Sequence, residues 1–117
     1  MSVPSQERKM MPLPSQEFFE TLIQRNPPQP HEPFVCVRFT ASWCGPCKRV
    51  DTNYLLSVSD KIKWYVCDID ENDYTPGYCG VQQIPSFQAI VNGVPQPIFQ
   101  NSNNQQIVQW LQKTFKL

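Results

Sequence analysis

The stretch that decides the fold is FVCVRFTASWCGPCK, residues 34–48. Its opening part, Phe34 to Thr40, is rich in β-branched and aromatic residues and is apolar on both alternating faces except at Arg38. This pattern is typical of a central strand that is buried on both sides, as parallel sheets require. Cys44 and Cys47 follow at the junction between this strand and a helical run. The sequence therefore predicts a buried strand that carries two cysteines to the start of a helix.

The spacing of these cysteines suits thiol chemistry. Two cysteines separated by two residues at a helix start can close a small disulfide ring, and another thiol can open it. The unpaired N–H groups and the dipole of the helix favour an anion at Cys44, which supplies an attacking thiolate. Cys47 lies one turn further in and suits a resolving role. Pro46, near the first helical turn, costs no hydrogen bond and stiffens the loop.

Strand-like and helix-like segments alternate on either side of this site. Upstream, we expect an edge strand at Lys9–Leu13 and a helix that Ser15 caps and that runs to about Arg25. Between Asn26 and Pro33, four prolines in eight residues predict a stiff, extended linker around a solvated His31. Two overlapping PxxP patterns in this linker leave docking to an aromatic groove as an alternative, although no basic anchor flanks them. A continuous helix is expected after the cysteines, with one face formed by Cys47, Val50, Tyr54 and Val58.

The downstream half predicts three more strands, at Ile62–Ile69, Ser86–Val91 and Val94–Gln100. The dipeptide Asn92-Gly93 between the last two is a strong hairpin signal. A short helix or turn is expected near Pro76 and Gly77, and a final amphipathic helix from about Asn103 to Phe115. The order β-α-β-α-β-α-β-β-α predicts an α/β fold, with a central mixed sheet of about four to five strands and helices on both faces.

On four stretches, the chain resembles the thioredoxin family. They are WCGPCK (Trp43–Lys48), CDIDEN (Cys67–Asn72), VQQIPSF (Val81–Phe87) and VNG (Val91–Gly93). The order and spacing agree from about Lys9 to the C-terminus, which implies a thioredoxin domain over residues 9–117 after a flexible tail over residues 1–8.

The resemblance also implies how the site works. A cis bond is expected before Pro85, which would then lie against the disulfide. The backbone of Ile84 would pair with an extended substrate peptide while Trp43 lines the groove. Gly45 and Pro46, between the cysteines, complete the expected substrate-binding residues.

The five cysteines leave a competing interpretation, because thiolates bind zinc and Cys36, Cys67 and Cys79 could join the pair. The sequence has no second CxxC and no His pair, so we expect no metal and no organic cofactor. Cys36 and Cys67 lie within strands, where small buried thiols are common. Cys79 lies in a polar stretch before the Pro85 loop, which leaves an exposed, regulatory thiol or a link to a second chain as an alternative to a structural role.

Arg38 departs from the family pattern, since most thioredoxins have a buried Asp there that helps to deprotonate the resolving cysteine. A buried guanidinium needs a partner. We expect Asp51, one helical turn beyond Cys47, to form an ion pair with Arg38 and to tune the site with it; Asp68 is the second candidate. A cation near the sulfurs makes the couple more oxidising. The alternative is a paired interior residue without effect on the sulfurs.

Two smaller departures concern the surface. Thr52 stands where many relatives have a kinking proline, which predicts a straighter helix. Asn101 stands about where the family has a glycine close to the disulfide, which predicts a narrower groove for partner proteins.

The composition of the 117 residues excludes other classes of function. The 10 Lys and Arg balance the 10 Asp and Glu, so no net field attracts nucleic acid or an anionic membrane. No signal peptide or membrane span is recognisable, and we expect a cytoplasmic monomer. The predicted function is the reduction of protein disulfides, with a thioredoxin reductase as electron donor. The alternative is a thioredoxin-like adaptor in which the CxxC pair only switches an interface.

Overall fold

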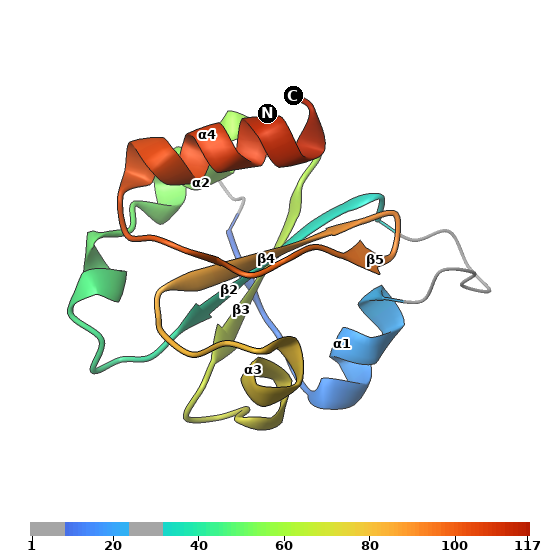
Figure 1. Ribbon diagram of the computed structural model, residues 1–117, viewed down its shortest axis with the longest axis vertical. Helices are drawn as coiled ribbons and strands as arrows, with labels where there is room; N and C mark the ends of the chain where they lie inside the picture. Colours follow the sequence, from blue (N-terminus) through green and yellow to red (C-terminus); the bar gives the residue numbers. More distant parts are fainter. Residues whose placement is uncertain (1–8, 24–31) are drawn as a thin grey trace, which may run out of the picture.

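A central mixed sheet organises the computed structural model, which describes residues 9–23 and 32–117 (Figure 1). The strands follow the order β1-β3-β2-β4-β5, and β6 also pairs with β4. Two hydrophobic clusters occupy the two faces of the sheet. The expected α/β thioredoxin-type architecture is confirmed, and the sheet has six strands among the described residues in place of the expected four to five.

Strand β2 (Phe34–Thr40) lies at the centre, as its sequence predicted. It pairs in parallel with β3 (Lys63–Asp68) and antiparallel with β4 (Ser86–Val91). Val35, Val37 and Phe39 belong to the cluster on one face, whereas Cys36 belongs to the cluster on the other. Burial on both faces therefore explains why this strand is apolar almost throughout.

The edges of the sheet are shorter than expected. β1 covers only Met11–Pro12 and pairs in parallel with β3, so the predicted edge strand is present but shorter than expected. Beyond β4, the predicted single strand is divided into β5 (Val94–Pro95) and β6 (Phe99–Gln100). Pro95 and Pro97 lack the N–H that a continuous ladder needs, which accounts for the division.

The hairpin between β4 and β5 is confirmed. Asn92 and Gly93 have φ values of 52° and 82°, in the left-handed region that a tight two-residue turn requires. Val91 and Val94 are partners on either side of the turn.

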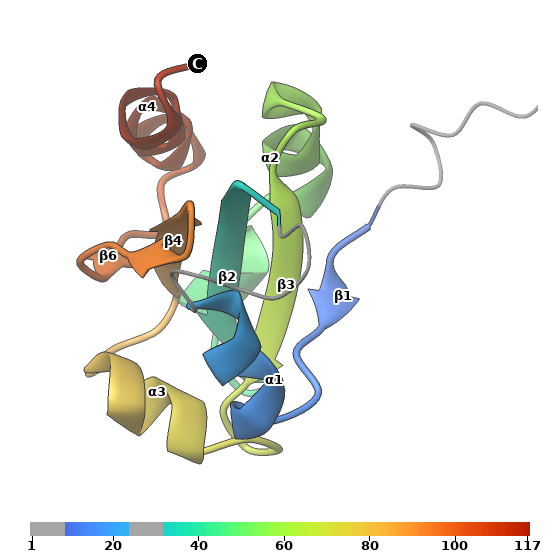
Figure 2. The ribbon, with the colours of Figure 1, turned by 90° about the vertical axis from the view of Figure 1, so that its right-hand side faces the viewer.

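In the part of the chain that the structure describes, four α-helices cover the sheet, two on each face (Figure 2). α1 (Gln16–Leu22) and α3 (Tyr74–Cys79) pack on one side, and α2 (Thr52–Val58) and α4 (Asn104–Phe115) on the other. Ser15 caps α1 by accepting the N–H of Phe18 at 3.1 Å, as predicted. No helix among the described residues has the length and apolar character needed to cross a bilayer.

The predicted continuous helix after the cysteines is wrong, and so is the expectation that Thr52 straightens it. A 3-10 helix, η2, covers Pro46–Arg49, Val50 is extended, and α2 begins only at Thr52. Asp51 caps α2 by accepting the N–H of Tyr54 at 3.1 Å. A side-chain oxygen that satisfies a free N–H favours a new helix start at this point, which periodicity alone did not reveal.

Several expectations fall on residues 1–8 and 24–31, which lie outside the described residues. These are the N-terminal tail, the predicted end of the first helix at Arg25, most of the proline-rich linker, and His31.

Candidate active site

Cys44 and Cys47 form a disulfide at the carboxyl end of β2, with their Cα atoms 5.3 Å apart. Pro46 occupies the first turn of η2, where a missing N–H costs nothing. Cys47 lies inside η2 and is 1% exposed, against 4% for Cys44. The predicted placement of the two cysteines is confirmed, although the first turn is a 3-10 helix.

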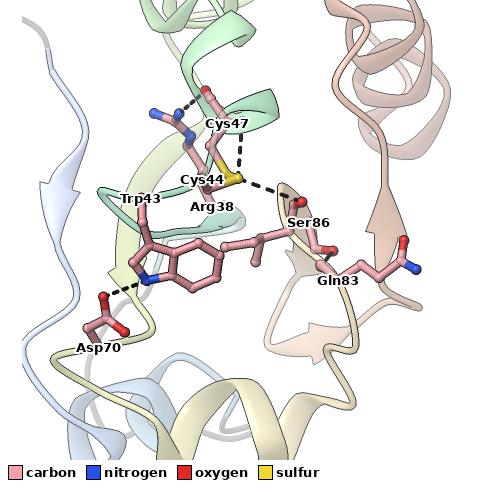
Figure 3. Close-up of a disulfide and its surroundings, with 8 residues drawn as sticks. Arg38, Trp43, Cys44, Cys47, Asp70, Gln83 and Ser86 are labelled. Carbon is pink, nitrogen blue, oxygen red and sulfur yellow. Dashed lines mark hydrogen bonds between the residues drawn. A yellow bond between two sulfur atoms is a disulfide. The ribbon is translucent and has the colours of Figure 1, made fainter.

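The surroundings of the two sulfurs differ in a way that fits two roles (Figure 3). The backbone N–H of Cys47 points at Cys44 Sγ, with a separation of 3.2 Å. An N–H donor stabilises negative charge on sulfur, so it favours Cys44 as the thiolate nucleophile when the disulfide is reduced. Ile84 O lies 3.8 Å from the same sulfur.

The loop before β4 packs against the disulfide. The Ile84-Pro85 peptide bond is cis, as the resemblance implied. Ile84 packs against the cluster formed by Ala41, Cys44 and Cys47, and Ser86 donates a hydrogen bond to Gln83 O at the base of the loop. The tertiary fold therefore brings together residues that are 40 positions apart in the sequence.

An apolar groove opens beside this loop. It has a volume of about 550 Å³, and its lining includes Trp43, Ile69, Asp73, Pro76, Val81 and Ile84. Trp43 is 65% exposed and its indole N–H donates to Asp70 Oδ2 at 2.9 Å. Gly45 and Pro46 are exposed next to the disulfide but are absent from the lining of this groove.

Asp70 and Ile69 are site residues that sequence reasoning missed. Asp70 fixes the indole of Trp43, and Ile69 packs against both Cys44 and the sheet cluster. The signal was present in the resemblance, because CDIDEN covers the end of β3, the strand that neighbours β2, and the four residues after it.

The predicted ion pair of Arg38 with Asp51 or Asp68 is wrong. Arg38 is half-buried, and its Nη2 donates to the backbone carbonyl of Cys47 at 2.9 Å. Among the described residues, no carboxylate lies within ion-pair distance of it, and Asp51 is engaged in capping α2. The hydrogen-bond acceptor of Arg38 is thus a backbone carbonyl, and not the carboxylate that its positive charge led us to expect. Burial lowers the pKa of Arg38.

The other three cysteines are free thiols. Cys36 and Cys67 are fully buried, as expected. Burial raises the pKa of Cys67 to about 12, with a contribution from Asp68. Cys79 is half-buried against the cluster that contains Cys67, which does not favour the alternative of an exposed thiol. Burial, and secondarily Cys67, raises the pKa of Cys79 to about 12.

Within residues 9–23 and 32–117, no group of three or more His, Cys, Asp or Glu side chains is arranged to hold a metal ion.

The side chain of Asn101 is directed to α4 instead of the groove. Its Nδ2 donates to Gln106 Oε1 at 2.6 Å, and its Oδ1 accepts the N–H of Asn103 at 2.7 Å. These bonds give no support to the expected narrowing of the groove, which stays a prediction. The neighbouring Asn104, which the sequence did not single out, bonds to the backbone of Arg49 and Asp51 behind the site.

The family model and two curated relatives that match this chain belong to one family. The family model for thioredoxin matches residues 9–113. Thioredoxin M2, chloroplastic, of Arabidopsis thaliana is 42% identical over 62 residues, which are 50% of this chain and 33% of that protein. Thioredoxin of Gallus gallus is 32% identical over 79 residues, which are 65% of this chain and 74% of that protein.

A solved structure extends the likeness to the fold. The crystal structure of thioredoxin from Trypanosoma brucei brucei matches 100% of both chains with a TM-score of 0.81, at 22% identity. The chain spans only 33% to 58% of the length of the first curated relatives that it matches.

Proposed function

Because the chain belongs to the thioredoxin family, we propose that it is an oxidoreductase that reduces disulfide bonds in other proteins. The observation that carries this proposal is the Cys44–Cys47 disulfide at the carboxyl end of β2, with the N–H of Cys47 directed at Cys44 Sγ. The same two residues can hold a disulfide or release an activated thiolate, which is what repeated exchange requires.

The reaction proceeds in two exchanges. The Cys44 thiolate attacks one sulfur of the substrate disulfide, a Cys44–substrate bond forms, and the other substrate sulfur leaves and takes up a proton. Cys47, having lost its proton, then attacks Cys44 Sγ and displaces the second substrate sulfur, which is also protonated. The substrate gains two electrons and two protons, and the protein is left with the Cys44–Cys47 disulfide.

Substrate binding uses the groove beside the disulfide. Its lining is mostly apolar and includes Trp43 and Ile84, so an extended segment with apolar side chains fits it. The backbone of Ile84 pairs with that segment, and Pro85, Gly45 and Pro46 shape the surface around the sulfurs. The neutral composition fits recognition by contact instead of long-range attraction.

The partners follow from this function. Disulfide-containing proteins are the substrates, and a thioredoxin reductase returns electrons to Cys44 and Cys47. We propose that the chain works as a monomer in the cytoplasm, where thiols such as Cys36 and Cys67 stay reduced. Fractionation of the source cells checks the compartment, and light scattering checks the oligomeric state.

The test is turbidimetric reduction of insulin by dithiothreitol. The unaltered protein should accelerate it, Cys44→Ser should abolish the acceleration, and the matched control Cys79→Ser should retain it. Cys47→Ser should accumulate a mixed disulfide with a cystine-bridged peptide, visible as a mass increase that dithiothreitol removes. No acceleration by the unaltered protein would reject the reductase and favour the adaptor.

A further inference from the structure

Arg38 places a half-buried positive charge beside the backbone of Cys47, next to the active-site disulfide (Figure 3). It lies on the same face of β2 as Cys36 and extends to η2, where Nη2 meets the carbonyl of Cys47. The hydrophobic cluster on this face of the sheet is formed by Cys36 and apolar side chains of β3, β4, α2 and α4. A cation in such surroundings interacts strongly with any charge that develops near it.

The guanidinium has a donor that is not used in the disulfide form. Arg38 Nε is buried and has no hydrogen-bond partner among the described residues. Buried donors are nearly always paired, so an unpaired one at a reactive site needs an explanation. Burial lowers the pKa of Arg38, yet guanidinium remains charged at neutral pH.

Reduction supplies an acceptor that the disulfide lacks. In the disulfide both sulfurs are neutral, whereas the reduced form contains the Cys47 sulfur, which ionises before it attacks Cys44. Arg38 Nη2 already donates to the carbonyl of Cys47 at 2.9 Å. The positive charge is therefore held next to the residue that carries the sulfur. A cation at this position favours the thiolate over the thiol.

We propose that Arg38 is a positioning residue that holds the resolving Cys47 and stabilises its thiolate in the reduced protein. This rests on the proposed function and adds how the second exchange is driven. It also gives the position an electrostatic effect opposite to that of the carboxylate expected there in the family, because a negative charge disfavours a nearby thiolate.

Apart from Arg38 and Cys44, no charged or titratable side chain among the described residues forms a hydrogen bond or ion pair with Cys47. Lys48 and Arg49 on η2 are exposed, and β4 has no ionisable side chain. Asp51 is exposed and caps α2. The remaining groups are Cys44 in the site, Cys36 on β2, Tyr54 on α2, Lys113 in the last turn of α4, and Lys63, Tyr65, Cys67 and Asp68 on β3. Among the described residues, Arg38 is the charged side chain that bonds to Cys47.

The test isolates Cys47 in a Cys44→Ser background. The rate of alkylation of Cys47 by iodoacetamide is followed against pH by mass spectrometry, and thiolate absorbance at 240 nm gives a second measure. C44S/R38M removes the charge at similar side-chain length. The midpoint of its alkylation profile against pH should lie at least one pH unit above that of C44S. That shift corresponds to about a tenfold loss of thiolate below the midpoint. C44S/R38K keeps the charge and should recover most of the loss.

A second readout uses the protein with both cysteines. Without the positive charge, the equilibrium with glutathione should move about tenfold toward the Cys44–Cys47 disulfide, at a pH above the thiolate midpoint of the parent. Circular dichroism checks that R38M is folded; if it is not, R38Q takes its place.

Coincident pH profiles of C44S and C44S/R38M would overturn the proposal and leave Arg38 a purely structural residue. A profile for C44S/R38K that matches R38M would do the same. These readouts do not depend on turnover. Failure of insulin reduction with a shifted profile would reject the proposed function alone.

Discussion

Replacing Asn104 with alanine should loosen the connection between the active-site segment and α4. The side chain of Asn104 accepts the N–H of Asp51 at 2.8 Å and donates to Arg49 O at 2.9 Å. It therefore ties the break between η2 and α2 to a helix more than 50 residues later in the chain. No other side chain among the described residues is recorded bonding to both of these backbone groups.

The expected cost follows from these two bonds. A hydrogen bond contributes a net 0.5–1.5 kcal/mol, so losing two costs roughly 1–3 kcal/mol. Alanine recovers up to about 0.7 kcal/mol through its higher helix propensity. A net loss of roughly 0.3–2.3 kcal/mol remains, which lowers the urea midpoint by roughly 0.2–1.2 M at a slope of about 2 kcal/mol per M.

Urea unfolding followed by far-UV circular dichroism measures this loss, with the disulfide intact. Asn53→Ala is the matched control, because Asn53 is exposed on α2 and should change stability by less than about 0.5 kcal/mol. Amide hydrogen exchange adds a local readout: the N–H of Asp51 should exchange faster in N104A but not in Asn103→Ala, which removes only the cap of α4. Equal midpoints for N104A and N53A, with unchanged exchange at Asp51, would refute the reasoning.

Three further predictions concern the core and the free thiols. Leu111→Ala should cost about 2–5 kcal/mol in urea unfolding, because Leu111 is fully buried on α4; a loss below about 1 kcal/mol would contradict the packing. The pKa of Cys67 is raised to about 12 in the fold, against about 8.5 for an unfolded thiol. The protonated thiol therefore stabilises the fold fully below pH ~8.5, and this contribution declines as the pH rises toward 12. The urea midpoint should fall between pH 8 and 10.5, and less so in Cys67→Val; equal falls would exclude Cys67 as the cause. Cys79 should react with Ellman's reagent at least ~100-fold more slowly in the native protein than in urea, because few thiolates form. Rapid native labelling, or a disulfide-linked dimer on a non-reducing gel, would show that Cys79 is accessible after all.

The sequence determined those features whose causes are local. Phe34 to Thr40 is apolar on both faces because the strand has packed layers on both sides. Asn92 and Gly93 tolerate positive φ, so they fix the hairpin whatever surrounds it. The spacing of Cys44 and Cys47 is sufficient for a disulfide, because only three peptide bonds separate them and keep them within reach.

Only the tertiary structure decided which partners the polar side chains near the site find. Arg38 bonds to a backbone carbonyl instead of Asp51, since every residue offers such an acceptor and the sequence does not mark one. Asp51 is taken by the start of α2, and Asn104 reaches back to it across the fold. Trp43 finds Asp70 only because β3 lies beside β2. Periodicity and turn chemistry act over a few residues, whereas these contacts depend on how distant elements pack, so they emerge only when the chain has folded.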